Sequence, residues 1–265
     1  MSHGDGPACE YLRSTGRIAM AHRGFTSFKF PMNTMGAFDE AAKLGFRYIE
    51  TDVRATRDGV AVILHDRRLP ARCGLPETID RLAWREARTA DLGAGQTIPA
   101  LEELLVALPQ VRVNIDIKAE SAIEPTVEVI ERLNAHDRVL VTSFSDRRRR
   151  RALGLLSKRV ASSAGTVAFL ALMAAKTPAS RAYAWRLLHD SDCLQLPPRL
   201  GRLPVITPAL VRAAHASGRQ VHAWTVDDPA VMGALLDIGV DGIITDRADL
   251  LRDVLIARAE WSPLS

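Results

Sequence analysis

The sequence has little of what stabilises extracellular proteins or anchors membrane proteins. Its 265 residues include three cysteines, Cys9, Cys73 and Cys193, whose odd number and wide spacing argue against a disulfide framework or a zinc site. No apolar run approaches the ~20 residues that a membrane-spanning helix needs. The first ten residues, MSHGDGPACE, lack the basic and apolar segments of a signal peptide. We therefore expect a cytoplasmic protein.

Charge of one sign is not in large excess either. The net charge is +4 at pH 7, which favours anionic substrates or peripheral contact with an anionic membrane but is too weak to indicate a nucleic-acid partner. Hydrophobic residues make up 47% and charged residues 25%, as in an ordinary globular protein. The length suits one α/β barrel or two small domains, so the pattern along the chain has to decide.

Short apolar runs alternate with longer helical patterns along the chain. The apolar runs predict nine strands, at 17–22, 46–53, 60–65, 111–117, 138–144, 159–163, 192–196, 220–226 and 241–245. Helices are predicted near 34–44, 100–108, 122–135, 146–156, 166–188, 207–217 and 228–238. This alternation is typical of βαβ units and a parallel sheet.

The second and third predicted strands are too close in sequence to be parallel neighbours. Residues 54–59 alone separate them, whereas a parallel crossover takes about a dozen residues, and Asp58-Gly59 is a hairpin turn signal. Residues 60–65 are therefore predicted to return antiparallel, as a hairpin arm that carries His65 to the barrel mouth. Eight strands remain, which predicts an α/β fold of the (β/α)8 TIM-barrel class.

The predicted barrel occupies residues 17–257 as a single catalytic domain. Residues 1–16 are predicted to be a loose leader, and residues 258–265 a C-terminal tail. Residues 67–99 are rich in glycine and proline and predict a loop-rich insertion after the second strand, with one short helix near 79–90. Because long excursions of this kind are usually functional, we place the insertion at the barrel mouth.

Ionisable residues collect at the predicted carboxyl ends of the strands, where barrel enzymes carry their active sites. Glu50 and Asp52 are two residues apart on one strand, so both carboxylates point to the same face and repel unless a cation joins them. Asp116 is the natural third ligand. An all-oxygen set suits Mg²⁺ or Ca²⁺ rather than zinc.

Two histidines and two cationic residues complete the predicted site. His22 and His65 are the candidate general acid and base, with their individual roles left open, because imidazole titrates near neutral pH. Arg23 and Lys118 are candidate phosphate ligands. Together with the metal, these residues predict cleavage of a phosphodiester. The other histidines are interpreted as structural.

Six motifs occur in the chain: HRG at 22–24, ETD at 50–52, HD at 65–66, NIDIK at 114–118, WTVDD at 224–228 and DGIITD at 241–246. With them the sequence resembles the glycerophosphodiester phosphodiesterases from about residue 17 to residue 255. The resemblance implies a PLC-like TIM barrel, a divalent metal, and hydrolysis of glycerophosphodiesters to sn-glycerol 3-phosphate and an alcohol. It implies the roles given above, and places Trp224 beside the glycerol moiety.

The chain departs from the family pattern at two positions. Asp116 stands where the family usually has Glu, which predicts a shifted or weaker metal site. Met32 stands where the family's loop usually has Glu before Asn33 and Thr34, which predicts an altered rate or substrate preference. Sphingomyelinase D-like enzymes are similar in having Asp at the first position, but their C-terminal tail motif has no match in this chain.

Three further features allow alternatives. Asn33 and Thr34 are predicted to cap the following helix, and Asp246 to cap a last helix or orient a loop. The run of arginines at 147–151, with Asp146 as predicted N-cap, is interpreted as a solvated basic helix or else as a patch for anionic phospholipid. The apolar stretch 167–175 is predicted to pack as a helix, or else to form an apolar rim for acyl chains or a dimer contact. Together, the arginine run and this apolar stretch motivate the alternative of a lysophospholipase D-like activity on single-chain lysophospholipids.

A catalytically silent barrel that binds phosphodiesters is the alternative from a different class. The departures at Met32 and Asp116 motivate it, although both histidines are kept. The oligomeric state is predicted as monomer or homodimer.

Overall fold

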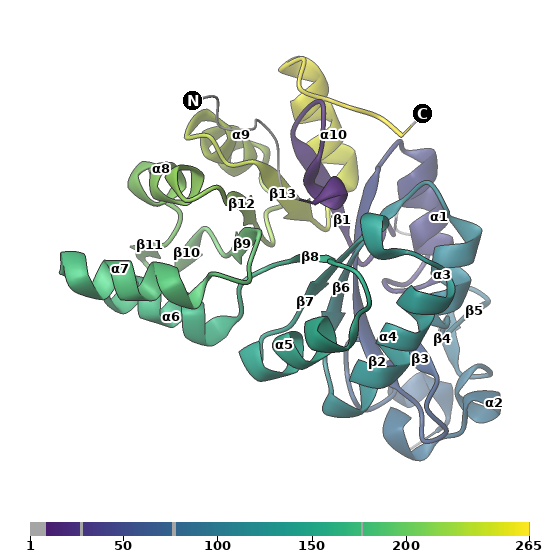
Figure 1. Ribbon diagram of the computed structural model, residues 1–265. Coiled ribbons are helices and arrows are strands. Elements are labelled where there is room, and N and C mark those ends of the chain that lie inside the picture. The colour runs from purple at the N-terminus through teal and green to yellow at the C-terminus, as the bar shows by residue number, and fades with distance from the viewer. Residues whose placement is uncertain (1–8, 27–28, 76–77, 176, 265) are drawn as a thin grey trace.

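A parallel barrel with helices packed around it forms the centre of the computed structural model, which describes residues 9–26, 29–75, 78–175 and 177–264 (Figure 1). The barrel strands are β1 (Ile18–His22), β2 (Tyr48–Ala55), β6 (Arg112–Ile117), β7 (Val139–Thr142), β8 (Ala161–Ser162), β9 (Cys193–Leu196), β12 (Gln220–Ala223) and β13 (Gly242–Thr245). Their order is β8-β7-β6-β2-β1-β13-β12-β9, and a parallel bridge between Ser163 and Cys193 joins the two ends. The predicted TIM barrel is confirmed.

The hairpin arm is also present. Strand β3 (Ala61–Ile63) pairs antiparallel with the last residues of β2, from Val53 opposite Ile63 to Ala55 opposite Ala61. The turn uses Gly59 in the left-handed region, with φ of 79°. Nε of Arg54 donates to the carbonyl oxygen of His65 at 2.8 Å, which fixes the end of the arm. The sequence argument about the short connection was therefore right.

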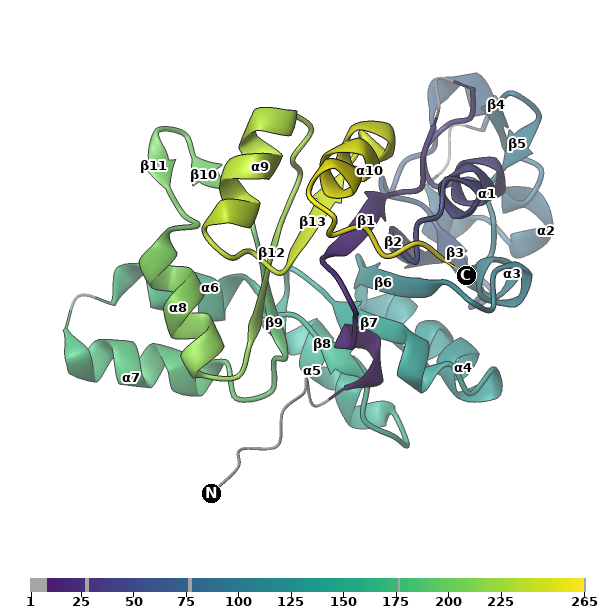
Figure 2. The same cartoon turned by 90° about the horizontal axis from the view of Figure 1, so that it is seen from above.

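The helices cover the outside of the barrel, as the view from above shows (Figure 2). They are α1 (Met35–Lys43), α3 (Leu101–Ala107), α4 (Ile123–Arg132), α5 (Asp146–Leu155), α6 (Thr166–Ala174), α7 (Pro178–Leu187), α8 (Pro208–Ala216), α9 (Pro229–Asp237) and α10 (Ala248–Ala257). Apolar side chains between the strands and these helices form the largest core cluster. Within the described residues, no helix is long and apolar enough to cross a bilayer.

One predicted helix is in fact two. The helix expected at 166–188 is interrupted, because Thr177 is the N-cap of α7 and Pro178 takes its first position. The residue before a proline is disfavoured in helical conformation, and proline has no N–H to continue the preceding helix. The last helix, α10, was not among the predicted ranges, although one predicted role of Asp246 was to cap a last helix.

The predicted loose leader is partly a packed element. Residues Glu10–Leu12 form a 3-10 helix, and Tyr11 and Leu12 are buried against Met20 and Tyr48 at the base of the barrel. Tyr48 Oη donates to the carbonyl oxygen of Tyr11 at 3.0 Å. The packing of Tyr11 and Leu12 departs from the predicted loose leader because their side chains close the bottom of the barrel, whereas residues 13–15 are exposed. Residues 1–8 lie outside the described residues.

The insertion between β3 and α3 has a small core of its own. It contains the 3-10 helices Ala71–Cys73 and Ile79–Arg81, the short helix α2 (Trp84–Ala87) and the hairpin of β4 (Asp91–Gly93) and β5 (Gln96–Thr97). Its buried side chains, among them Ile79 and Leu92, cluster with Val62 and Leu64 of the arm. The insertion therefore supports the arm that carries His65.

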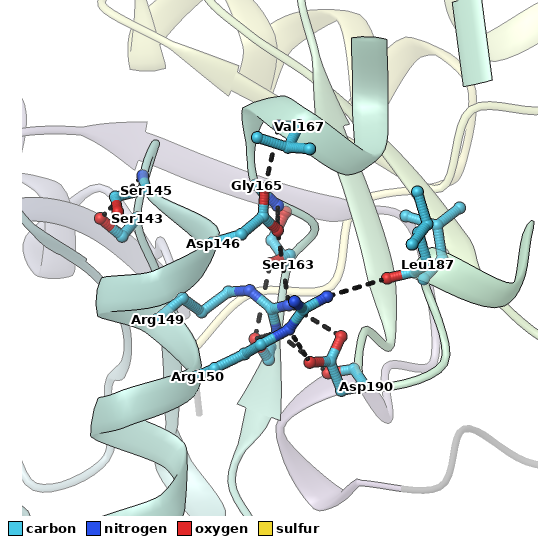
Figure 3. A network of polar contacts seen from close by, with 12 residues as sticks. Ser143, Ser145, Asp146, Arg149, Arg150, Ser163, Gly165, Val167, Leu187 and Asp190 are labelled. Carbon is cyan, nitrogen blue, oxygen red and sulfur yellow. Dashed lines mark hydrogen bonds and ion pairs between the residues drawn. The ribbon is translucent and has the colours of Figure 1, made fainter. Parts of the chain in front are cut away.

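The arginine run bonds to other parts of the protein, as Figure 3 shows for Arg149 and Arg150, although Arg147, Arg150 and Arg151 are exposed. Each of the five guanidinium groups donates to a protein oxygen. Arg147 bonds Glu120, and Arg151 bonds Glu124. Arg148 bonds the Ile117 carbonyl and the Ser143 hydroxyl, while Arg149 and Arg150 both bond Asp190. Arg149 is completely buried. The interpretation as a solvated basic helix is therefore wrong for the buried part of the run.

The predicted cap of α5 differs by one residue. Ser145, not Asp146, is the N-cap, and its hydroxyl accepts from the backbone N–H of Arg148. The buried Asp146 carboxylate instead accepts from the N–H groups of Gly165 and Val167. It thereby ties α5 to the start of α6.

Removing the Asp190 carboxylate is expected to destabilise the barrel strongly. Asp190→Ala leaves the buried Arg149 charge with only the longer contact to Asp146 at 3.6 Å, and breaking a buried ion pair lowers the free energy of unfolding by about 3 kcal/mol. Arg150→Ala is the matched control, because Arg150 is half exposed and bonds the same carboxylate; it should cost less than about 1 kcal/mol. Urea unfolding of both variants measures the difference. Equal, small losses would mean that the buried pair contributes no net stability.

Candidate active site

All eight predicted site residues line one pocket. The pocket has a volume of about 370 Å³ and opens at the carboxyl ends of the barrel strands. The predicted residues on its wall are His22, Arg23, Glu50, Asp52, His65, Asp116, Lys118 and Trp224. By contrast, none of the described side chains between 67 and 99 lies on the wall, so the insertion does not contact this space directly.

The HRG turn after β1 aims two of these side chains into the pocket. Gly24 has φ of 83°, and a Cβ there would lie 2.7 Å from the backbone carbon of Ala37. Only glycine fits such a position without moving α1. The backbone N–H of Arg23 donates to the carbonyl oxygen of Glu50, which holds the turn against β2.

His22 is held between two carboxylates. Its Nδ1 donates to Oδ1 of Asp246 at 2.6 Å, and its Nε2 lies 3.6 Å from Oε2 of Glu50. Asp246 does not cap α10, contrary to one of its predicted roles; its backbone N–H donates to Asp227 at the end of the neighbouring loop. Burial lowers the pKa of His22, but the hydrogen bond to Asp246 and the charge of Glu50 outweigh this, so the pKa is raised above its ordinary value.

Replacing Asp246 with asparagine is expected to slow turnover at least about tenfold and to shift the pH profile. Because Asp246 raises the pKa of His22, its removal lowers that pKa, and the limb of kcat/KM that reports His22 moves to lower pH. The Asp66→Asn variant is the control. Asp66 bonds Nδ1 of His65 at 2.8 Å, so that substitution should leave the limb of His22 in place. Identical profiles for Asp246→Asn and the unmodified protein would exclude Asp246 as the group that orients His22.

His65 lies in a more open environment than His22. Its side chain is 43% exposed, against 16% for His22. The arm places it on the same pocket wall, and the bond from Arg54 to its carbonyl oxygen limits its movement. The two imidazoles therefore differ in solvent access.

Asp52 is the most heavily contacted carboxylate of the site. Arg23 Nε lies 2.9 Å from its Oδ2, Lys118 Nζ lies 2.8 Å from its Oδ1, and Asn33 Nδ2 donates to Oδ2 at 2.9 Å. Burial alone would raise the pKa of Asp52, but the charges of Lys118 and Arg23 hold it below its ordinary value. Asp52 is thus ionised in this arrangement.

Asn33 belongs to the site, and the sequence interpretation missed it. Thr34 alone is the N-cap of α1. The Asn33 amide lies buried between Thr51, whose hydroxyl donates to it at 2.9 Å, and Asp52. Its φ of 58° falls in the left-handed region, which asparagine tolerates better than most residues. The signal in the sequence is an Asn in the loop after HRG, which is equally typical of a cap.

Met32 is 40% exposed and is not among the residues that line the pocket. Its predicted effect on rate or substrate preference stays a prediction.

The donor atoms fit a hard divalent cation. Oε2 of Glu50 and Oδ1 of Asp116 are buried oxygens without a hydrogen-bond donor among the described residues. Burial and the charge of Asp52 raise the pKa of Glu50 to about 8, and burial raises that of Asp116. Both pKa values are raised because the nearby cationic side chains do not fully balance the buried negative charge. A divalent cation bound by these carboxylates would balance it.

Lys118 stands where it competes with such a cation. Its Nζ lies 2.8 Å from Asp52 and 2.6 Å from Asp116, so it joins two of the three predicted ligands. In this arrangement, no three His, Cys, Asp or Glu side chains of the described residues are grouped as a ready metal site. The three carboxylates therefore fit a metal by their chemistry, while Lys118 balances their charge in the structure as it stands.

The wall opposite the carboxylates is apolar. Strand β9 lies four places from β2 in the barrel order, and the side chains contributed from that half include Phe169, Leu196 and Leu200. Trp224 joins them, with its ring 5.8 Å from that of Phe144 in an edge-to-face arrangement. Lys118 Nζ lies 5.3 Å from the Phe144 ring, so cationic and apolar groups meet there. The pocket can hold a molecule with an anionic centre and an apolar or uncharged arm.

Comparison with known proteins extends this picture. The model of the "Glycerophosphoryl diester phosphodiesterase family" matches residues 22–250, a range that contains all eight predicted site residues. The chain is 74% identical to "Probable glycerophosphodiester phosphodiesterase 2" of Mycobacterium tuberculosis, over 98% of this chain and 99% of that protein.

Solved structures share the fold. A glycerophosphodiester phosphodiesterase from Agrobacterium tumefaciens is 25% identical with a TM-score of 0.72, and the match covers 89% of this chain and 98% of that one. An Oleispira antarctica phosphodiesterase, solved in complex with the product sn-glycerol-3-phosphate, is 23% identical with a TM-score of 0.75, over 91% of this chain and 97% of that one. Each of these matches extends over about nine-tenths of this chain.

Proposed function

Since the chain belongs to the glycerophosphoryl diester phosphodiesterase family, we propose that its pocket hydrolyses glycerophosphodiesters to sn-glycerol 3-phosphate and an alcohol. The observation that carries the proposal is the set of groups on one pocket wall: two histidines, three carboxylates and two cationic side chains. A phosphodiester needs charge neutralisation at its phosphate and two proton transfers. This set supplies both.

The two histidines carry the proton transfers in this proposal. One takes the proton from the attacking oxygen, and the other protonates the leaving oxygen of the alcohol. Asp246 bonds Nδ1 of His22 and Asp66 bonds Nδ1 of His65, so in both rings Nε2 is the nitrogen left for proton transfer.

Arg23 and Lys118 bind the phosphate oxygens in this proposal, and Trp224 lies beside the glycerol moiety. Both cations contact Asp52, so the carboxylate orients the groups that receive the phosphate. A divalent cation, Mg²⁺ or Ca²⁺, held by Glu50, Asp52 and Asp116 would add Lewis-acid polarisation of a phosphate oxygen.

A panel of diesters tests the proposal. The purified chain is freed of metal with a chelator and supplied with Mg²⁺ or Ca²⁺, and release of sn-glycerol 3-phosphate is measured from glycerophosphocholine, glycerophosphoethanolamine and glycerophosphoglycerol. We expect turnover with at least one headgroup in the presence of metal. Binding of these diesters without any turnover would favour the silent barrel instead.

A lysophospholipase D-like activity is the second candidate, and the apolar wall of the pocket favours it. Phe169, Leu196 and Leu200 offer contacts to a hydrocarbon chain that glycerophosphocholine does not have. Lysophosphatidylcholine and glycerophosphocholine are compared side by side for release of choline. No choline from the lysolipid would exclude this candidate.

Peripheral contact with an anionic membrane through residues 147–151 stays a prediction; Arg149 is buried, while Arg147, Arg150 and Arg151 are exposed and bond acids of the protein. The cytoplasmic location and the choice between monomer and homodimer stay predictions.

A further inference from the structure

Exposed apolar side chains border the mouth of the pocket. Phe144, Val167, Leu170, Leu200 and Leu203 are each between 49% and 66% exposed, and we call these five residues the apolar rim. Phe144 and Leu200 also line the pocket, so the rim continues from the pocket wall onto the surface. Exposed apolar groups on elements that reach the same pocket mark an interaction surface more often than scattered ones do.

The elements of the rim have geometry that presents these side chains together. Val167 and Leu170 are three residues apart on α6 and therefore lie on the same helix face. Leu200 and Leu203 are paired partners in the hairpin of β10 (Arg199–Leu200) and β11 (Leu203–Pro204), so their side chains share one face. Helix α6 reaches the pocket through Thr166 and Phe169. Rim and pocket thus share two elements.

Helix α6 is apolar on every side, yet it lies at the surface. Its sequence TVAFLALMA has no charged residue, and Ala168 is the one residue of this fully described helix that is buried. A helix that is apolar all round is normally covered by protein or lipid. The exposed side of α6 is therefore expected to have a partner.

The charge of this half of the barrel indicates the kind of partner. Even without the bonded run at 147–151, residues 152–226 contain nine Lys and Arg against two acids, Asp190 and Asp192, a net charge of +7, while the rest of the chain carries −3. Those two acids are already bonded to Arg149, Arg150 and Arg159. A second copy of the chain docked on this face would set cation against cation, whereas an anionic surface is attracted.

Two arginines lie directly beside the rim. The hairpin sequence RLGRL alternates Arg199 and Arg202 with the two rim leucines, and both arginines are exposed. In the described part of the chain neither forms an ion pair with an acid; Arg199 donates to the carbonyl oxygen of Arg202. Apolar side chains that insert among acyl chains, flanked by cations at the phosphate level, are typical of interfacial membrane binding.

We propose that the apolar rim, with Arg199 and Arg202, docks the protein on an anionic phospholipid membrane with the pocket mouth facing the lipid headgroups. The inference goes beyond the hydrolysis of soluble diesters and does not depend on which diester is hydrolysed. It places diesters at the membrane surface within reach of the pocket. The cationic surface differs from the 147–151 run that the sequence suggested.

Vesicle flotation tests the proposal on the full chain. Large vesicles of phosphatidylcholine alone or of equal parts phosphatidylcholine and phosphatidylglycerol are mixed with protein, and the floating fraction is measured. We expect binding to the phosphatidylglycerol vesicles that falls more than about tenfold in Val167→Asp/Leu170→Asp and in Leu203→Asp. Arg199→Glu/Arg202→Glu should fall by a similar factor and lose the preference for anionic lipid.

The control is Val106→Asp. Val106 is 59% exposed on α3, away from α6 and the hairpin (Figure 1), so this change adds the same charge without touching the rim. Thermal unfolding of each variant checks that the fold is kept. No flotation of the unmodified protein, or equal flotation of rim and control variants, would refute the proposal. So would a dimer in sedimentation velocity that the rim variants dissociate, since the rim would then bind a second copy.

Discussion

Alanine in place of His22 or His65 is expected to lower kcat for the best diester by about 10² to 10⁴-fold, the range that a positioned general acid or base contributes. Each variant removes one of the two proton transfers, and the remaining imidazole cannot perform both at once. Both rings line the pocket with Nδ1 bonded to a carboxylate, so neither is free to replace the other. Steady-state kinetics at saturating metal measures the loss.

His189→Ala is the control for this pair. His189 is exposed and bonds the backbone oxygen of Arg186 on α7, so kcat should stay within about twofold of the unmodified protein. If His22→Ala and His65→Ala both retained full turnover, the proposal of two catalytic histidines would be wrong.

Substrates with different leaving groups distinguish the general acid from the general base. With a p-nitrophenyl ester of glycerol phosphate, the leaving phenolate needs little protonation, so loss of the general acid is expected to matter much less than with a choline ester. The variant that recovers on this substrate lacks the acid, and the variant that does not recover lacks the base. Equal losses on both substrates would contradict a division into acid and base.

The second large effect is expected at the carboxylates. Glu50→Gln removes a buried ligand oxygen and should lower turnover by about 10³-fold, which corresponds to ~4 kcal/mol of the several that a Lewis acid contributes. Chelation of the unmodified protein should have an effect of the same size, and added Mg²⁺ or Ca²⁺ should reverse it.

Thermal unfolding gives a readout that does not depend on activity. In the unmodified protein, metal at 100 times its dissociation constant is expected to stabilise the fold by about 2.7 kcal/mol, and Glu50→Gln should lose most of this. Glu102→Gln is the control, because Glu102 is a surface carboxylate on α3 that bonds Arg132. Metal that stabilises Glu50→Gln as strongly as the unmodified protein would show that Glu50 is not a ligand.

Asp116 and Lys118 refine the same experiment. Asp116→Glu lengthens the side chain by one methylene, to the residue that the family resemblance leads us to expect there, and it should tighten metal binding if Asp116 is a ligand. Lys118→Gln removes the cation that joins Asp52 and Asp116, so metal should stabilise this variant at least as well while turnover falls. Weaker stabilisation in Lys118→Gln would contradict the competition between lysine and metal.

Much of the fold and of the site followed from the sequence. The short link at 54–59 required an antiparallel arm, and the structure has it. Seven of the eight site residues stood toward the carboxyl ends of predicted barrel strands, and parallel strands bring those ends to one side of a barrel; His65 joined them on the antiparallel arm. The length of one connection and the position of residues along predicted strands were therefore sufficient to predict the arm and the residues of the pocket.

Tertiary structure alone decided which side chains touch. Register pairs Ala21 of β1 with Thr245 of β13, so the next residues, His22 and Asp246, meet although 224 positions separate them. No local pattern distinguishes such an aspartate from a helix cap. The burial of Tyr11 depends in the same way on the space that the closed barrel leaves at its base. The sequence by itself determined which groups reach the pocket, while barrel closure and strand register decided their partners, because these contacts join elements that are remote along the chain.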